Sequence, residues 1–283
     1  MKVYTTKTDI NEAIKALKTQ HKSIGFVATM GALHQGHLAL VKTALSQNNI
    51  AVVSIFVNPT QFNNQEDLDA YPRTLERDIN LLQSVSNKSI LVFAPTVETI
   101  YHGNTTSEHF DFDGLEFEME GKFREGHFDG VGTIVKRLLD IVKPDKAYFG
   151  EKDFQQLQII KKLAKKHTIQ TEIIGCPIHR ETSGLALSSR NERLKKDYKN
   201  EAPFIYKILK AAKAKFGTKS ATKITEWVTK QFAKNKLLEL EYFIIADVQT
   251  LKPVKRKSNK KTYRAFIAVY ADDIRLIDNI ALN

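Results

Sequence analysis

The first 176 residues alternate between short apolar runs and longer stretches in which apolar residues recur at helical spacing. The apolar runs have the length of strands and are bounded by turn residues: 24–28, 50–57, 90–94, 146–149 and 169–176. The helical stretches lie at 8–18, from 37 onward, at 74–85, at 131–142 and up to 166. This alternation predicts an α/β fold with a doubly wound, Rossmann-like parallel sheet. Because such sheets bind ligands at the carboxyl ends of their strands, functional residues are expected there.

The chain changes character after residue 178. Amphipathic helices and strands follow in a different order: helices at 198–215 and 222–236, then strands at 240–248, 263–270 and 274–280. We therefore expect two domains, a Rossmann-like domain over residues 1–178 and a smaller α+β domain over residues 179–283.

Composition excludes several classes of protein. With 42% hydrophobic and 27% charged residues, the chain is typical of globular proteins, and no apolar run approaches membrane-spanning length. The first ten residues are too polar for a signal peptide, and the single cysteine, Cys176, allows no disulfide within the chain. We expect a cytoplasmic protein without membrane contact, in which Cys176 is a buried structural thiol rather than a nucleophile.

The chain is strongly basic, with 43 Lys and Arg against 32 Asp and Glu, a net charge of +11. This balance favours anionic partners such as nucleotides, phosphates or nucleic acid. Much of the excess is lysine in runs such as Lys255 to Lys261, which are typical of solvated surfaces. Basic clusters interleaved with aromatic residues are not evident, so we expect no nucleic-acid partner.

The stretch from Gly25 to Val41 carries the strongest functional pattern. It runs from a strand through a turn with two glycines into a helix, and it contains His34-Gln35-Gly36-His37. A helix N-terminus directs main-chain N–H groups and a positive dipole end at one point, which suits an anion. The two imidazoles sit where that anion would lie. A metal-binding pair and two unimportant surface histidines are the alternatives.

The pattern of these four residues resembles the His-x-Gly-His signature of a nucleotidyltransferase superfamily that activates substrates with ATP. The resemblance implies that His34 and His37 contact the phosphates and stabilise charge while the α-phosphorus is attacked.

Polar residues also follow the next strand, in Asn58-Pro59-Thr60-Gln61-Phe62. An amide can donate and accept a hydrogen bond at once, so Asn58 and Gln61 on a turn made rigid by Pro59 suit a small polyhydroxy acid. An ordinary polar turn is the alternative.

The strand at 146–149 ends at Gly150-Glu151-Lys152-Asp153, which opens the next helix. Lys152 can hold a phosphate as a point charge, and Asp153 can hold Mg²⁺ or a ribose hydroxyl. Asp153 can equally be only a favourable charge at a helix N-terminus. Arg124 and His127 lie ahead of the helix at 131–142.

The segment from 180 to 191 contains Ser188-Ser189-Arg190 after Gly184. Two hydroxyls beside a guanidinium suit a clamp for a triphosphate. A simple helix cap by Ser188 or Ser189 is the alternative.

Taken together and in this order, the stretches 29–37, 58–62, 121–132 with 149–156, and 180–191 resemble the pantothenate synthetase (pantoate–β-alanine ligase) family. The resemblance implies an ATP-dependent reaction in two steps. The pantoate carboxylate attacks the α-phosphorus, giving pantoyl adenylate and pyrophosphate, and the amine of β-alanine then displaces AMP to give pantothenate.

The resemblance also implies site residues. His34, His37 and Lys152 are the expected catalytic groups, and Gln61 and Gln156 are expected to hold pantoate, with Gln61 also near β-alanine. Asn58 is expected in the same pantoate and β-alanine site because of its amide on the turn after the strand. Mg²⁺ would bridge phosphate oxygens, with Asp153 as a candidate ligand. The nucleotide-binding residues that it implies are Thr29, Met30, Gly31, Ala32, Leu33, His34, Gln35, Gly36, His37, Gly150, Glu151, Lys152, Asp153, His179, Leu187, Ser188, Ser189 and Arg190.

Four positions depart from the pattern of the family: Ala28 replaces a common Pro, Gln35 a Glu, His179 a Val and Leu187 a Met. None of them removes a group expected to do chemistry, but they leave the shapes of the adenine and pantoate pockets open. The family also suggests a homodimer. We expect the smaller α+β domain, hinged near His179, to act as a lid over the nucleotide, which would protect an acyl adenylate from water.

Two rival functions remain at this stage. One is nucleotidyl transfer to a phosphate ester, which would not need the stretches at 58–62 and 150–153. The other is nucleic-acid binding without catalysis, which would weaken log-linearly with salt and turn over no ATP.

Overall fold

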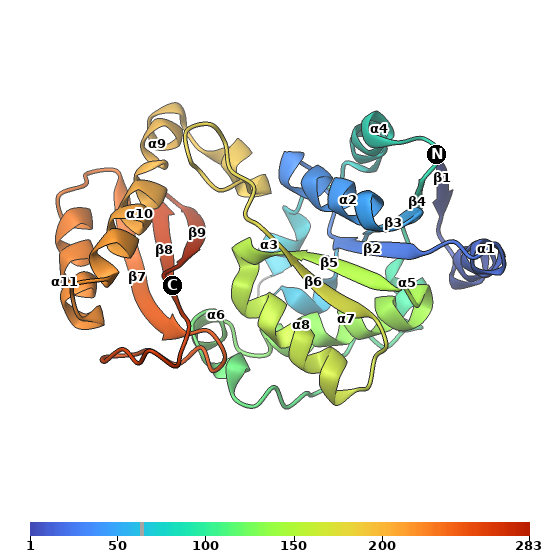
Figure 1. Cartoon of the computed structure of the whole chain (residues 1–283). Coiled ribbons are helices and arrows are strands. Elements are labelled where there is room, and N and C mark those ends of the chain that lie inside the picture. The colour runs from blue at the N-terminus through green and yellow to red at the C-terminus, as the bar shows by residue number, and fades with distance from the viewer. Residues whose placement is uncertain (63–64) are drawn as a thin grey trace. The chain divides into compact units, whose positions relative to one another are not determined.

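The computed structural model of the chain describes residues 1–62 and 65–283, which form two compact units (Figure 1). The first unit comprises Met1–Glu151 and Gln155–Pro177, and the second comprises Lys152–Phe154 and Ile178–Asn283. The division predicted after residue 178 leaves Lys152–Phe154 in the first part, whereas their contacts assign these residues to the second unit. That the units are separate folding domains stays a prediction.

A six-stranded parallel sheet forms the centre of the first unit. Its strands are β1 (Lys2–Tyr4), β2 (Ile24–Thr29), β3 (Ile50–Ile55), β4 (Ile90–Phe93), β5 (Lys146–Gly150) and β6 (Glu172–Cys176). Their order across the sheet is β1-β4-β3-β2-β5-β6, and every pair is parallel. This confirms the predicted doubly wound α/β class. The chain reverses its direction of winding between β2 and β5, which is the point where such sheets bind ligands.

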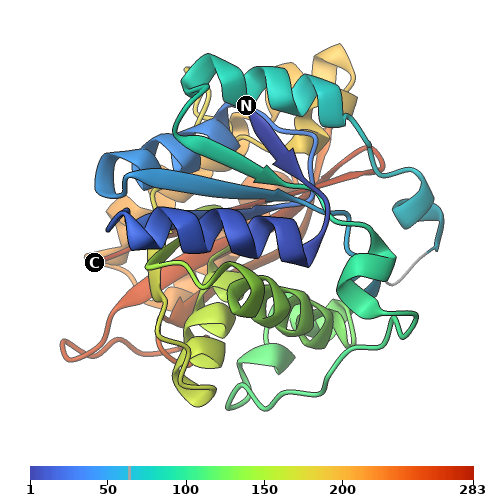
Figure 2. The same ribbon diagram turned by 90° about the vertical axis from the view of Figure 1, so that its right-hand side faces the viewer.

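Helices cover both faces of this sheet: α2 and α4 lie on one face, and α1, α7 and α8 lie on the other (Figure 2). The bounds are α1 (Lys7–Thr19), α2 (Gln35–Gln47), α4 (Leu75–Val85), α7 (His127–Val142) and α8 (Phe154–Lys166), with the shorter α3 (Gln65–Asp69), α5 (Val97–Tyr101) and α6 (Glu120–Phe123). Double coverage explains why β2 and β3 read as nearly continuous apolar runs. On the α2 side, Val41 and Leu82 are buried in one cluster with Val27 and Val53.

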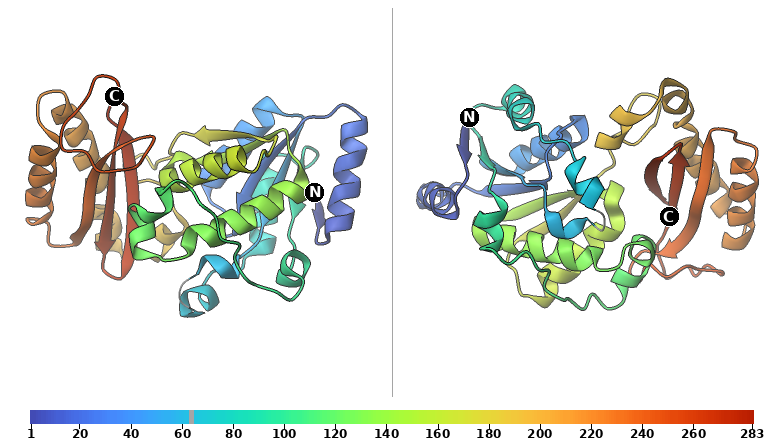
Figure 3. Two further views of the ribbon diagram at one scale, coloured as in Figure 1. Left: turned by 90° about the horizontal axis from the view of Figure 1, so that it is seen from below. Right: turned by 180° about the vertical axis from the view of Figure 1, so that it is seen from behind.

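The second unit has an antiparallel sheet with the order β7-β8-β9 and helices packed on it (Figure 3). The elements are α9 (Lys196–Glu201), α10 (Phe204–Phe216), α11 (Ala221–Phe232), β7 (Leu238–Asp247), β8 (Tyr263–Ala271) and β9 (Ile274–Ala281). Ile208 of α10 and Val228 of α11 share a core with Ile245 and Ile267 of the sheet. The predicted α+β character is confirmed.

Two sequence-based predictions of elements need correction. The single helix expected at 198–215 is two helices, because Pro203 lacks the N–H that would bond to the carbonyl of Lys199. The strand β1 was not predicted, since three residues carry no periodic pattern. Pairing with β4, in which Val3 lies opposite Val92, decides its conformation.

Among the helices of the described residues, none combines the length and the apolar character needed to cross a membrane.

Candidate active site

The turn that follows β2 has a left-handed main chain. Gly31 has a φ of 86° and Ala32 a φ of 49°. A left-handed residue other than glycine costs on the order of 1–2 kcal/mol, so Ala32 requires support from its surroundings. The hydroxyl of Thr29 gives part of it, accepting from the Gly31 N–H at 3.2 Å and donating to the Ser54 carbonyl at 2.7 Å.

Asp78 of α4 gives the rest of that support. Its two carboxylate oxygens accept from the N–H of Ala32 at 3.0 Å and from the N–H of Leu33 at 2.7 Å. The residue is 0% exposed, and this burial raises the pKa of its carboxyl group. Asp78 was not among the site residues predicted from the sequence. The available signal was its position one helical turn before Leu82, which places a charged residue on the buried face of α4.

His34 and His37 cap the N-terminus of α2 with their rings. The Nδ1 atom of His34 accepts from the Gly36 N–H at 3.1 Å, and that of His37 accepts from the His34 N–H at 3.3 Å. The ring centroids are 4.0 Å apart. Because each Nδ1 accepts a hydrogen bond, Nε2 is the ring nitrogen that can carry a proton to donate. The structure thus brings the two histidines together at the carboxyl end of β2, as a reciprocal cap.

The polar turn after β3 is held from the inside by Asn58. This side chain is 1% exposed, and its oxygen accepts from the Tyr101 hydroxyl at 2.5 Å. Its nitrogen donates to Thr60 Oγ1 at 3.1 Å and to the Gly130 carbonyl at 3.3 Å. A Cβ atom at Gly130 would come within 2.2 Å of the Thr60 carbonyl, so this approach of α7 requires glycine. Asn58 therefore shapes the turn from within.

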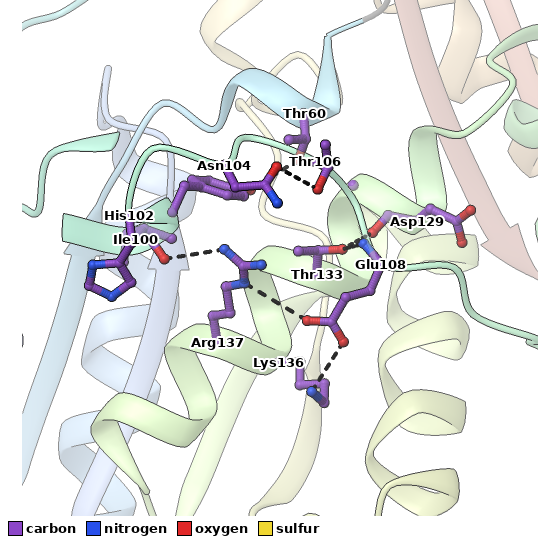
Figure 4. A network of polar contacts seen from close by, with 12 residues as sticks. Thr60, Ile100, His102, Asn104, Thr106, Glu108, Asp129, Thr133, Lys136 and Arg137 are labelled. Carbon is purple, nitrogen blue, oxygen red and sulfur yellow. Dashed lines mark hydrogen bonds and ion pairs between the residues drawn. The ribbon is translucent and has the colours of Figure 1, made fainter. Parts of the chain in front are cut away.

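Tyr101, the partner of Asn58, lies beside a network of polar contacts that Figure 4 shows around Arg137, Glu108 and Lys136. The guanidinium of Arg137 lies 4.5 Å from the centroid of the Tyr101 ring and donates to the Ile100 carbonyl at 3.2 Å. Glu108 pairs with Arg137 at 3.9 Å and with Lys136 at 3.2 Å. These contacts place α7 and the segment after α5 around the turn.

Gln61 follows on the same turn, and its main chain and side chain have different environments. The main-chain carbonyl accepts from Arg124 at 3.0 Å and contacts Nδ1 of His127 at 3.2 Å. The half-buried side-chain amide makes no hydrogen bond to the described residues. Arg124 and His127 thus hold the main chain at Gln61, and neither of them engages its side-chain amide.

The two adjacent glutamines of α8, Gln155 and Gln156, also differ in whether the protein engages their amides. Gln155 is buried and pins the segment before α6, donating to the carbonyls of Leu115 at 2.8 Å and Glu118 at 2.6 Å. The next residue, Gln156, is half-buried, and within the described ranges its amide has no hydrogen-bond partner. Only Gln156 of the two has an amide that is suited to a ligand.

Gly150 ends β5, and Lys152 and Asp153 follow in a short helical turn. The ammonium of Lys152 lies 3.7 Å from the carboxylate of Asp153, and the Lys152 side chain is 18% exposed. The Lys152 carbonyl accepts from the Asn279 amide at 2.9 Å. Across the described residues, no three His, Cys, Asp or Glu side chains gather as metal ligands. Asp153 fits Mg²⁺ only as one carboxylate alongside substrate phosphates.

The segment after His179 forms a small hairpin in the second unit. Arg180 pairs with Ala186 across it, and the Leu187 N–H donates to the His179 carbonyl at 3.0 Å. Ser188 then caps a short helix, accepting from the Arg190 N–H at 3.2 Å. The hairpin brings His179 beside Leu187. Ser188 has the capping role that was one of its two interpretations.

Comparison with known proteins decides among the functions that this geometry permits. The chain matches the model of the pantoate-beta-alanine ligase family over residues 2–281. The chain belongs to this family. It is 58% identical to the pantothenate synthetase of Flavobacterium psychrophilum over 282 residues, covering 100% of both sequences.

Two solved structures of pantoate–β-alanine ligases are similar throughout. The pantothenate synthetase of Thermus thermophilus is 37% identical with a TM-score of 0.90, covering 100% of this chain and 99% of that one. A Francisella tularensis pantoate–β-alanine ligase, solved with β-γ ATP and β-alanine, is 37% identical with a TM-score of 0.80, covering 100% and 98%. This member of the family therefore joins pantoate to β-alanine in an ATP-dependent reaction.

Proposed function

We propose that the ligase activates pantoate as an acyl adenylate, with His34 and His37 on the phosphates of ATP. The observation that carries the proposal is the pair of imidazoles at the first turn of α2, directly beyond the carboxyl end of β2. Donors fixed in advance stabilise the charge that develops as a phosphorus is attacked. The support for this geometry from Thr29 and Asp78 fits such a need.

In the first step, a pantoate carboxylate oxygen forms a bond to the α-phosphorus and the bond to the leaving pyrophosphate breaks. In the second, the β-alanine nitrogen bonds to the acyl carbon, AMP leaves with the oxygen, and the nitrogen loses a proton. Imidazoles that carry their proton on Nε2 can donate to phosphate oxygens in the first step.

Gln61 and Gln156 are the proposed contacts to pantoate, with Gln61 also near β-alanine. Both amides are half-buried and have no hydrogen-bond partner in the described part of the chain, as expected of groups that await a ligand. Asn58 contributes to the acid site through the turn that carries Gln61, because its own amide is already engaged.

Lys152 is proposed to stabilise the transferring phosphoryl group as a point charge. Asp153 is the proposed protein ligand for Mg²⁺, which when bound would neutralise phosphate charge. The neighbouring carboxylate at 3.7 Å would keep the Lys152 ammonium oriented.

The remaining nucleotide contacts are proposed on two segments. The turn from Met30 to Leu33 and the first turn of α2 would hold the phosphates. The hairpin from His179 to Leu187 would face adenine through main-chain groups, with Ser188, Ser189 and Arg190 on the triphosphate. The β-γ ATP and β-alanine in the Francisella tularensis relative support sites for both compounds.

We further infer a homodimer, a lid role for the second unit and a cytoplasmic setting. The single cysteine, Cys176, is a buried free thiol, which fits a reducing compartment. Sedimentation would test the dimer: a single monomeric species at micromolar concentration would refute it.

An isotope experiment tests the adenylate directly. Pantoate labelled with ¹⁸O in its carboxylate should pass one labelled oxygen to AMP, while pyrophosphate remains unlabelled. Release of pyrophosphate with pantoate and ATP before β-alanine is added should accompany it. Unlabelled AMP, or label in a phosphate product, would exclude attack of the carboxylate on the α-phosphorus. Turnover with a phosphorylated acceptor alone would favour nucleotidyl transfer.

A further inference from the structure

Two adjacent residues of β9, Asp278 and Asn279, hold two segments of the second unit that lie far apart in sequence. The carboxylate of Asp278 accepts from both terminal nitrogens of Arg180, at 2.6 Å and 2.8 Å. The amide of Asn279 donates to the carbonyl of Lys152 at 2.9 Å. Both proposed nucleotide segments of this unit are therefore attached to one strand.

Burial and a second hydrogen bond fix the side chain of Asn279 in its contact with Lys152. Asn279 is 1% exposed, and its side-chain oxygen accepts from the guanidinium of Arg264. That guanidinium lies 4.0 Å from the centroid of the Phe154 ring, two residues beyond Lys152. The orientation of the amide is thus set: its oxygen faces a donor, and its nitrogen faces the carbonyl.

The attachment explains why Lys152–Phe154 belongs to the second unit although Glu151 and Gln155 belong to the first. Here the main chain at Lys152 is held by β9, and Phe154 packs near Phe266 of β8 with ring centroids 5.9 Å apart.

We propose that Asn279 is a positioning residue for Lys152, fixing the main chain of the lysine to the same strand that holds the hairpin after His179. The proposal rests on the role assigned to Lys152 above. Arg180 completes the arrangement from the hairpin side, since its guanidinium also lies 3.7 Å from the centroid of the Tyr206 ring. The distance between the lysine and the hairpin would then depend on one rigid strand rather than on a loop.

Asn279→Asp is the sharpest variant, because it retains the size of the side chain and its acceptor for Arg264. It replaces the nitrogen that donates to the Lys152 carbonyl with an oxygen, which repels that carbonyl, and it adds a carboxylate beside the guanidinium of Arg264. We expect the chain to fold with a lower melting temperature, because the variant buries a carboxylate, and pyrophosphate release from ATP and pantoate to slow roughly 10- to 100-fold. The KM for pantoate should change little, since its proposed contacts are elsewhere.

A double-mutant cycle separates positioning from a merely structural effect. If Asn279 acts through Lys152, the variant Lys152→Ala with Asn279→Asp should release pyrophosphate within about twofold of Lys152→Ala alone. Multiplication of the two separate losses would overturn the proposal, and so would a wild-type rate for Asn279→Asp. A wild-type rate for Lys152→Ala would instead refute the role of the lysine in the proposed function.

A matched control removes another amide of the same unit. The side-chain nitrogen of Asn235 donates to the carboxylate of Glu201 at 2.7 Å, far in sequence from Lys152, so the variant Asn235→Asp loses a donor as Asn279→Asp does. Asn235→Asp should keep the rate of pyrophosphate release within about twofold of wild type. A loss equal to that of Asn279→Asp would show that any weakened amide of this unit slows the reaction, and would overturn a specific role for Asn279.

Discussion

A carboxylate oxygen of Asp78 accepts a hydrogen bond of 2.7 Å from the main-chain N–H of Leu33, 45 residues earlier in the chain. The other oxygen accepts from Ala32, whose φ of 49° is left-handed. A fully buried carboxyl group therefore holds the turn that precedes His34. Burying a carboxyl group costs folding free energy, so the hydrogen bonds that fix this turn are gained at the expense of stability.

Asp78→Asn should weaken the first step of the reaction more than it weakens binding of pantoate. The asparagine can accept from only one of the two N–H groups, and its own nitrogen would face the other. We expect kcat for pyrophosphate release to fall about 10- to 100-fold, because small displacements of phosphate donors are amplified in the rate. Steady-state kinetics with varied ATP and varied pantoate would measure both effects.

Leu82→Ala is the matched control for Asp78→Asn. Leu82 lies one turn later on the same buried face of α4 and packs in the apolar cluster that includes Leu33, but it offers no acceptor to the main-chain N–H groups of the turn after β2. The free energy of unfolding should fall by about 2–5 kcal/mol, while kcat stays near wild type. If both variants lose kcat in proportion to stability, Asp78 is only a structural residue.

His37→Ala should abolish most adenylate formation while leaving the fold intact. The ring is part of a helix N-terminus, and its loss removes a cap worth about 1 kcal/mol as well as a donor to phosphate. Pyrophosphate release in the presence of pantoate is the measurement, with circular dichroism to verify the fold. A rate close to wild type would remove His37 from the proposed mechanism.

Gln61→Ala should raise the KM for pantoate more than the KM for ATP. The amide of Gln61 has no hydrogen-bond partner within the described residues, so its removal disturbs no hydrogen bond among them. We expect roughly a tenfold increase for pantoate, the value of one lost hydrogen bond to a charged group. Equal increases for both substrates would contradict the assignment of this side chain to the acid site.

Acid should weaken the attachment of the loop before α6 to α8. Lys162 and Lys166 hold Asp113 by hydrogen bonds at 2.7 Å and 2.5 Å, which lowers its pKa from 3.8 to about 2. A carboxyl group whose pKa is lowered on folding contributes stability above its unfolded pKa, and this contribution is lost as the pH falls toward the folded value. Unfolding by urea should therefore become easier between about pH 4 and about pH 2.

Asp113→Asn isolates that contribution. The variant should show a shallower fall of stability over the same pH range, and the difference from wild type should shrink in high salt because Asp113 is exposed. Identical pH profiles for the variant and the wild type would show that the pair contributes nothing to folding.

Local patterns were enough for the layout of the first unit. Apolar runs at 24–28 and 50–57 become β2 and β3 because strands covered on both faces need apolar residues throughout. The sequence also predicted that His34 and His37 lie at the start of a helix, because the strand, the turn and the helix are all encoded within about fifteen residues. The resemblance to the family, carried by four short stretches, indicated the reaction.

Contacts between segments that are far apart in the chain could not be predicted from the sequence. Asp78 meets Leu33, Asn58 meets Gly130, and Asn279 meets Lys152 across 45, 72 and 127 residues. The sequence around each residue does not predict its hydrogen-bond partner, because these hydrogen bonds form only after the sheets have formed. Pro203 is a local signal for a helix break, and it divides the helix expected at 198–215 into two helices.

The sequence by itself determined the α/β class, the order of elements and the chemical groups available at the strand ends, because periodicity and motif are local properties. Only the tertiary structure decided which buried polar groups hold the turns that carry those chemical groups. It also decided that the Lys152 carbonyl is held by β9. Every residue has the same main-chain carbonyl, so only packing determines which donor it meets.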